Sequence, residues 1–70
     1  MDIKFYTIDC TACNFLERKL NAKNLTYETI RDSDAIRKVA VQHAITSAPI
    51  LEVDGVVMPY ADAVSWVNKQ

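Results

Sequence analysis

Hydrophobic and polar residues follow two different patterns in the first third of the chain. Residues 2–8 (DIKFYTI) alternate loosely and are rich in residues that favour β-structure, which predicts a strand. Within residues 11–23, apolar side chains recur at every fourth position with charged ones between them, which predicts an amphipathic helix. Asn24 is a suitable end for this helix, because asparagine tolerates the left-handed backbone that often follows a helix.

The same succession of patterns continues to residue 43. Residues 25–30 (LTYETI) are enriched in β-branched and aromatic side chains and predict a second strand. The RDSD segment that follows supplies residues that commonly cap helix N-termini. From Ile36 to His43, the spacing i, i+3, i+4 and i+7 predicts a second helix, at whose C-terminal end a cationic imidazole suits the helix dipole.

The last part of the chain contains a hairpin signal. Residues 49–53 (PILEV) predict a third strand, whose first position tolerates proline because no N–H is needed there. Asp54-Gly55 is a strong signal for a tight hairpin turn, after which residues 56–58 return as a short fourth strand. Residues 60–68 predict a final helix with its apolar residues on one face.

The resulting element order is β-α-β-α-β-β-α, which places the chain in the α/β class. We expect residues 1–70 to form one domain with a four-stranded mixed sheet flanked by helices on both faces. The first two strands, joined by a helix, should lie parallel through a right-handed crossover. The last two strands should form an antiparallel hairpin.

Composition excludes several classes of protein. Half of the 70 residues are hydrophobic and 24% are charged, a balance typical of a folded domain. The formal net charge is −1 and there is no basic block, so we expect no nucleic-acid partner. No apolar run approaches a membrane span, and the first residues do not resemble a secretory signal. We therefore expect a cytoplasmic protein, in a compartment where lasting disulfides are rare.

The chain contains two cysteines, Cys10 and Cys13, at the junction between the first strand and the first helix. The i, i+3 spacing on a helix brings both sulfurs to one face, within reach of a disulfide. The unpaired N–H groups and the positive end of the helix dipole should favour a thiolate at Cys10. We therefore expect Cys10 to attack a disulfide and the more shielded Cys13 to resolve the mixed disulfide.

Two other uses of the pair were weighed. As a structural staple, a disulfide closing so short a loop would contribute only about 2 kcal/mol. As a zinc site, the pair lacks partners: a structural site needs four ligands, and His43 is the only histidine. A redox couple is favoured, while a metal shared between two chains remains an alternative.

Several segments together resemble the glutaredoxins, and most closely the small NrdH-type redoxins, which donate electrons to ribonucleotide reductase. The resemblance spans nearly the whole chain and rests on Tyr6, the CTAC motif, the segment TSAPILEV and the following Asp54-Gly55. It implies a thioredoxin-like fold and a cis peptide bond between Ala48 and Pro49. It also implies that the residue before the proline offers its backbone to an extended peptide or to glutathione.

The resemblance also implies a set of site residues. Cys10 and Cys13 are the catalytic candidates. The candidates for contacting the substrate are Tyr6, Thr11, Ala12, Ser47, Ala48, Pro49, Tyr60 and Asp62. Asp62 falls near the position where the family places an acid for the amine of glutathione.

The sequence departs from the family pattern at the positions that usually serve glutathione. Asp9 precedes Cys10 where many glutaredoxins have a basic residue nearby, and a like charge there opposes a thiolate. Pro59-Tyr60 replaces the small residues that normally approach glutathione, removing an N–H donor and adding bulk. We therefore expect glutathione to be a poor reductant.

The favoured function is a glutaredoxin-type thiol-disulfide oxidoreductase that acts as a monomer without a tightly bound cofactor. Its substrate would be a protein disulfide, with that of ribonucleotide reductase as a candidate. Glutathione or a thioredoxin reductase would restore the dithiol. Three alternatives stay open: a binding or redox-sensing module with little turnover, a glutathione-dependent enzyme, and a dimer that shares a metal.

Overall fold

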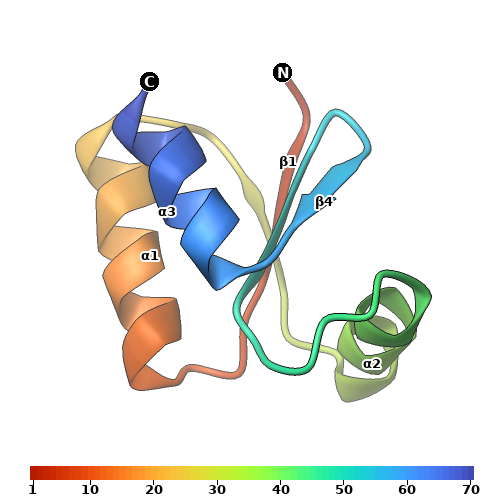
Figure 1. Cartoon of the computed structure of the whole chain (residues 1–70). Coiled ribbons are helices and arrows are strands. Elements are labelled where there is room, and N and C mark those ends of the chain that lie inside the picture. Colours follow the sequence, from red (N-terminus) through yellow and green to blue (C-terminus); the bar gives the residue numbers. More distant parts are fainter.

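The computed structural model describes residues 1–70 as one sheet with three helices packed against it (Figure 1). The strands are β1 (Ile3–Tyr6), β2 (Glu28–Ile30), β3 (Ile50–Val53) and β4 (Val56–Met58). The helices are α1 (Thr11–Ala22), α2 (Ser33–Gln42) and α3 (Tyr60–Asn68). The predicted β-α-β-α-β-β-α order is confirmed. None of these helices has both the length and the apolar character needed to cross a bilayer.

The four strands are arranged in the order β2-β1-β3-β4. β1 is parallel to β2 and antiparallel to β3, and β3 and β4 form an antiparallel hairpin, as the sequence predicted. The hairpin turn consists of Asp54 and Gly55, both with positive φ, at 49° and 86°. Positive φ at both central positions is what a tight turn between right-twisted strands requires, and Asp-Gly supplies it readily.

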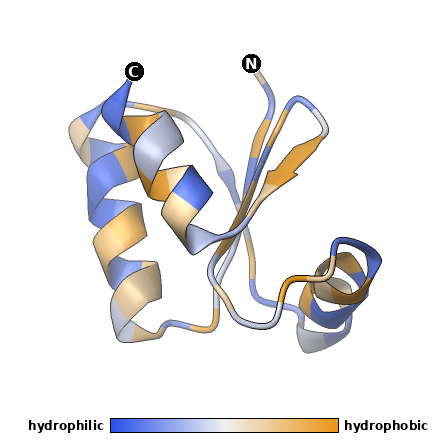
Figure 2. Ribbon diagram, viewed as in Figure 1, coloured by the Kyte–Doolittle hydropathy of each residue, from blue (hydrophilic) through white to orange (hydrophobic).

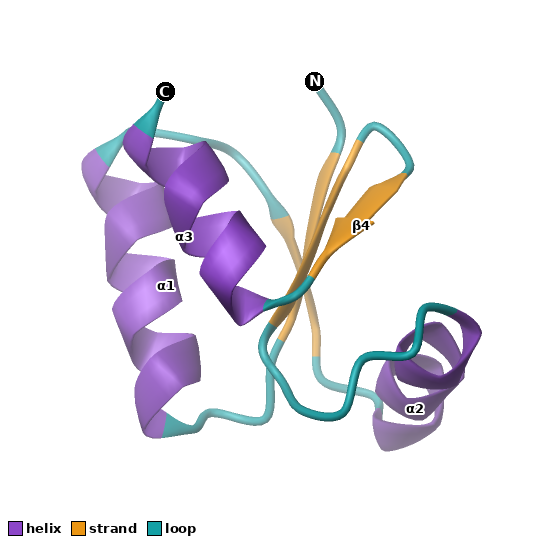
Figure 3. Cartoon of the chain, viewed as in Figure 1, coloured by secondary structure: helices purple, strands orange, loops and turns teal.

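The helices cover opposite faces of the sheet (Figures 1 and 3). α1 and α3 lie side by side on one face, and α2 lies alone on the other. The larger hydrophobic cluster fills the space beneath α1 and α3, and consists of Ile3, Phe5, Cys13, Leu16, Leu20, Leu51, Val53, Ala63 and Val67. A smaller cluster of Tyr6, Ile36 and Ile50 lies beneath α2.

Helix and strand ends differ from the predicted ones by a few residues, for local reasons. β1 ends at Tyr6, before the chain turns toward α1. β2 begins only at Glu28, because residues 25–27 form the approach to the sheet rather than part of it. Asn24 follows α1 with φ 55°, the left-handed conformation that its sequence position predicted. Figure 2 shows that the helices carry both hydrophobic and hydrophilic stretches, as expected of amphipathic helices on a sheet.

Candidate active site

Cys10 is the N-cap residue of α1. Its backbone is extended, with φ −81° and ψ 172°, and its carbonyl accepts the N–H of Asn14 at 2.9 Å. Its Sγ accepts the backbone N–H of Cys13 at 3.1 Å. Sulfur therefore takes the position that a serine or aspartate oxygen commonly occupies at the start of a helix. A thiolate at this position would face unpaired N–H groups and the positive end of the helix dipole.

The two sulfurs differ in their exposure to solvent. Cys13 is fully buried, and it belongs to the larger hydrophobic cluster beneath α1 and α3. Cys10 is partly exposed and packs against the edge of that cluster. Both cysteines are free thiols. Because an attacking sulfur must reach its substrate, accessibility assigns the first step to Cys10.

The two thiols titrate as a pair. A hydrogen bond with the Cys13 side chain, together with burial, raises the pKa of the Cys10 thiol, and the backbone N–H of Cys13 offsets this in part. Burial opposes ionisation of Cys13, but hydrogen bonds from the Cys10 and Thr7 side chains outweigh it and lower the pKa of the Cys13 thiol. The expectation that the pKa of Cys10 would be lowered is therefore wrong. Loss of the first proton leaves one proton shared between the two sulfurs. The pKa of this step therefore belongs to the pair rather than to either cysteine.

Thr7 is a site residue that the sequence analysis did not single out. It is 2% exposed, which makes it the buried polar residue of the core, and it follows β1 directly. Its hydroxyl oxygen accepts the N–H of Asp9 at 3.0 Å, and its side chain is one of the groups that lower the pKa of the Cys13 thiol. A polar residue at the end of a strand, three positions before the first cysteine, was the available signal. Its meaning depends on the fold, which places Cys13 beneath it.

Replacing Thr7 with valine is expected to raise the apparent pKa of the thiol pair by roughly one unit, because a hydrogen bond to the charged sulfur is lost. The measurement is a titration of thiolate absorbance in the reduced protein. Thr7→Ser, which keeps the hydroxyl, is the matched control and should stay near the wild-type pKa. An unchanged titration in Thr7→Val would show that the hydroxyl does not stabilise the ionised pair.

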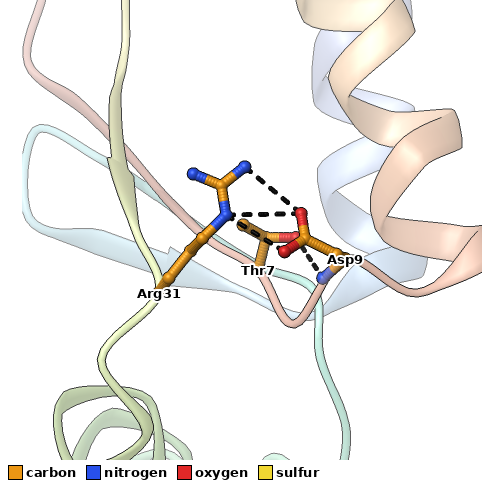
Figure 4. A network of polar contacts seen from close by, with 3 residues as sticks. All are labelled: Thr7, Asp9 and Arg31. Carbon is orange, nitrogen blue, oxygen red and sulfur yellow. Dashed lines mark hydrogen bonds and ion pairs between the residues drawn. The ribbon is translucent and has the colours of Figure 1, made fainter.

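Asp9 does not act on Cys10 as the sequence suggested. Its carboxylate forms an ion pair with Arg31 at 3.1 Å, and Figure 4 shows this pair beside Thr7. The groups that raise the pKa of Cys10 are Cys13 and the surrounding protein, and Asp9 is not among them. The expected repulsion by Asp9 is therefore not seen at Cys10, and the carboxylate is instead paired with a cation from a segment distant in sequence.

The segment that precedes β3 forms the second wall of the site. The Ala48–Pro49 peptide bond is cis, as the resemblance implied. Pro49 is buried, Ala48 is half-buried and Ser47 is exposed. No backbone hydrogen bond within the protein involves Thr46, Ser47 or Ala48. Their N–H and C=O groups are therefore available to a bound peptide.

Two cavities adjoin this segment. The larger, of about 480 Å³, has Cys10 on one side and Ser47 and Ala48 on the other. Its remaining lining is Ile8, Ile36, Arg37, Ala40, Thr46 and Ile50, so it is mainly apolar. The smaller cavity, of about 310 Å³, lies on the other side of the segment and includes Tyr60 and Pro59. Ser47 borders both cavities, so the structure brings Cys10, Ser47 and Ala48 together and places Tyr60 nearby.

Three of the predicted substrate contacts lie at the edge of this arrangement. Thr11 and Ala12 form the first turn of α1 between the cysteines, with Thr11 exposed. Neither lines a cavity. Asp62 is exposed in the first turn of α3 and also lines neither cavity. The part that these residues play in binding stays a prediction.

Tyr6, a predicted substrate contact, is buried in the structure. Its side chain is 5% exposed and belongs to the cluster beneath α2, with Ile36 and Ile50. Its hydroxyl donates a hydrogen bond to Glu52 at 3.3 Å, and burial raises the pKa of the phenol, with Glu52 adding to the shift. Side chains alternate along β1, so Tyr6 lies on the face opposite Phe5, where Ile36 of α2 packs against it. Tyr6 is therefore a packing residue and lies outside the two cavities.

No group of three or more His, Cys, Asp and Glu side chains is arranged to hold a metal ion. The site consists of two sulfurs, a threonine hydroxyl and a free backbone edge. These groups can exchange a disulfide: the accessible Cys10 sulfur, which accepts the backbone N–H of Cys13, could start the exchange, and the buried Cys13 sulfur could complete it.

Comparison with known proteins identifies the fold. No protein-family model matches the chain, and no curated protein sequence matches it. The crystal structure of the thioredoxin-like protein BC3987 is 24% identical and aligns with a TM-score of 0.74, covering 94% of this chain and 99% of that chain. The glutaredoxin-like protein NrdH-redoxin from Escherichia coli is 18% identical, with a TM-score of 0.75 over 99% of this chain and 93% of that one.

These alignments cover almost the full length of each chain, so they compare complete folds rather than a shared fragment. At this level of identity they establish the fold alone. The expected α/β class and mixed four-stranded sheet agree with both neighbours. This chain therefore has the thioredoxin-like fold, with Cys10 and Cys13 at the start of its first helix.

Proposed function

We propose that the protein is a thiol-disulfide oxidoreductase that reduces protein disulfides through Cys10 and Cys13. One observation carries the proposal: the accessible Cys10 sulfur caps α1 and accepts the N–H of the buried Cys13 at 3.1 Å. A structural pair has no need for one exposed sulfur at a helix N-terminus. The likeness to a thioredoxin-like protein and to a NrdH-redoxin supports the same chemistry.

The first step is attack by the Cys10 thiolate on one sulfur of the substrate disulfide. A bond forms between Cys10 Sγ and that sulfur, the substrate S–S bond breaks, and the other substrate sulfur leaves as a thiolate. The backbone N–H of Cys13 faces the Cys10 sulfur and favours the fraction of the singly ionised pair in which Cys10 carries the negative charge, and this fraction attacks. The departing thiolate takes up a proton from water.

The second step is attack by Cys13 on Cys10 Sγ. Cys13 gives up its proton, a Cys10–Cys13 disulfide forms, and the second substrate sulfur leaves as a thiolate that is then protonated. The substrate gains two electrons and two protons, which the dithiol loses. The Thr7 side chain, which favours the ionised form of Cys13, would still act on the resolving sulfur in this step, when Cys10 no longer has a thiol proton to donate.

The substrate is a protein segment in extended conformation. The free backbone groups of residues 46–48 would pair with it as an added strand and hold the substrate disulfide over Cys10. Ile8, which is 62% exposed and lines the same cavity as Cys10, offers apolar contact to a protein surface. By resemblance to the NrdH-type redoxins, the disulfide of a ribonucleotide reductase is a candidate substrate, and a monomer in the cytoplasm would serve it.

Glutathione is expected to be the poorer reductant, with a flavin-dependent thioredoxin reductase the better one. Glutathione carries two carboxylates, yet the cavity beside Cys10 offers one cation, Arg37, which is already hydrogen-bonded to Asp34 at 2.9 Å. At the start of α3, Pro59 has no N–H and Tyr60 occupies the smaller cavity. Both features reduce the number of hydrogen bonds and ionic contacts that the site can form with a small anionic peptide such as glutathione.

The test compares the two reducing systems with one disulfide-containing protein as substrate. We expect turnover with thioredoxin reductase and NADPH to exceed that with glutathione, glutathione reductase and NADPH by about tenfold or more, which corresponds to roughly 1.4 kcal/mol. Equal or faster turnover with glutathione would contradict the choice of reductant. No turnover with either system would contradict the proposed function and favour the alternative of a binding or sensing module.

A further inference from the structure

Asp9, the residue before Cys10, has an unusual backbone conformation. Asp9 has φ 59°, in the left-handed region, and it lies between the end of β1 and the N-cap of α1. Its N–H donates to the Thr7 hydroxyl at 3.0 Å. Aspartate visits this region more readily than most residues, but it does so at a cost that its surroundings must offset. The direction in which Cys10 leaves this turn depends on the conformation of Asp9.

Arg31 reaches Asp9 from the neighbouring strand. It follows β2, and the N–H of Thr7 donates to the carbonyl of Ile30 at 3.0 Å, which joins the ends of β1 and β2. The Arg31 Nε lies 3.3 and 3.1 Å from the two carboxylate oxygens of Asp9, and Nη2 lies 3.2 Å from Oδ1 (Figure 4). This forked contact fixes the carboxylate in orientation as well as position.

We propose that Arg31 is a positioning residue for the redox pair: it anchors the Asp9 carboxylate and cancels the negative charge of the residue that precedes Cys10. The inference rests on the proposed function, since it assigns Arg31 to the same dithiol. Arg31 does not touch the reacting sulfurs. It acts through Asp9, whose charge would otherwise oppose formation of a thiolate at the next residue.

The other charges near Cys10 do not replace Arg31. From α2, Arg37 lines the cavity beside Cys10, and its guanidinium is hydrogen-bonded to Asp34. From α1, Cys13 shares a proton with Cys10, and Glu17 acts on Arg31 rather than on the sulfurs. The hydrogen bond with Asp9 raises the pKa of Arg31, so the guanidinium stays charged wherever the thiols titrate. Arg31 is therefore the cation paired with the acid next to the nucleophile.

Stability alone does not account for the pair. The side chains of Arg31 and Asp9 are 56% and 58% exposed, and exposed ion pairs contribute little to the free energy of unfolding. Their position at the turn that carries Cys10 is what distinguishes them from an ordinary surface pair. Removing a surface ion pair elsewhere would leave the apparent pKa of the thiols unchanged, whereas removing this pair should change it.

The experiment titrates the thiolate absorbance of three reduced variants and measures their rate of reaction with a small neutral disulfide. In Arg31→Met, the exposed Asp9 charge should raise the apparent pKa of the pair by roughly half a unit and reduce the thiolate fraction below that pKa about threefold. The double variant Asp9→Asn/Arg31→Met should return to the wild-type pKa, because no charge is left to cancel and asparagine also tolerates the left-handed backbone. Arg18→Met, which removes an exposed arginine of α1 that forms no ion pair, should match the wild type.

Two results would overturn the inference. One is an apparent thiol pKa in Arg31→Met that equals the wild-type value. The other is an apparent thiol pKa in the double variant that is raised as much as in the single variant, which would mean that Arg31 supports the turn without acting through charge. Neither result depends on a protein substrate or on an external reductant. A wild-type protein that fails to reduce any protein disulfide would contradict the proposed function and leave this titration intact.

Discussion

Replacing Cys10 with serine is expected to reduce protein-disulfide reduction to the uncatalysed background. Cys10 is the accessible sulfur at the N-cap of α1, whereas Cys13 is fully buried and cannot reach a substrate. A serine oxygen can accept the same N–H of Cys13 but cannot be oxidised by a disulfide, so the helix cap survives and the chemistry does not. The measurement is the rate of reduction of a disulfide-containing protein, with folding checked by circular dichroism.

Cys13→Ser is the matched control. Cys10 should still attack, but the mixed disulfide then has no resolving sulfur and should accumulate. Mass spectrometry of the intact adduct should show the variant bonded through Cys10 to its substrate. If Cys10→Ser formed the adduct and Cys13→Ser did not, the order of attack would be reversed. Adduct formation by neither variant would mean that the pair does not exchange disulfides.

Replacing Leu16 with alanine is expected to remove a large fraction of the stability of the fold. Leu16 is fully buried in α1, within the same hydrophobic cluster as Cys13. Truncating a buried leucine typically costs about 2–5 kcal/mol, through lost burial and the cavity left behind. A domain of 70 residues has a total free energy of unfolding of roughly 4–10 kcal/mol, so the loss is a large fraction of the whole.

Urea denaturation followed by circular dichroism measures the loss directly as a lower midpoint. Val41→Ala is the control: Val41 lies in α2 with 76% of its surface exposed, and its truncation should change the free energy of unfolding by less than about 0.5 kcal/mol. A Leu16→Ala midpoint equal to that of Val41→Ala would contradict the core described beneath α1 and α3. A larger effect than expected would show that the cluster contributes cooperatively to the whole sheet.

Local signals in the sequence predicted the fold well. The three helices follow from apolar spacing, and the hairpin follows from Asp54-Gly55, whose turn geometry depends on neighbouring residues alone. The parallel pairing of β1 with β2 follows from the helix between them. Element ends were less predictable: β2 begins at Glu28 because the sheet, rather than the β-propensity of residues 25–27, determines which residues pair.

The candidate site was predicted in part. The cysteine spacing indicated a redox pair, and the segment before Pro49 was placed beside it by resemblance; the structure brings both to one cavity. Strand propensity did not tell which face of the sheet Tyr6 would point to, and the structure places it in the cluster beneath α2. Thr7 was missed because a threonine after a strand has no distinctive pattern, and its hydroxyl matters only through Cys13 beneath it.

What the amino-acid order alone determined is the set of elements, their pairing and the position of two cysteines at a strand-to-helix junction, since each depends on residues close in the chain. What the tertiary structure decided is the electrostatic state of those cysteines. Asp9 looked like an unopposed acid beside Cys10, but β1 and β2 lie side by side and bring Arg31 to it across 22 positions of sequence. The proton shared between the sulfurs depends likewise on burial and on contacts through space, which a linear pattern does not record.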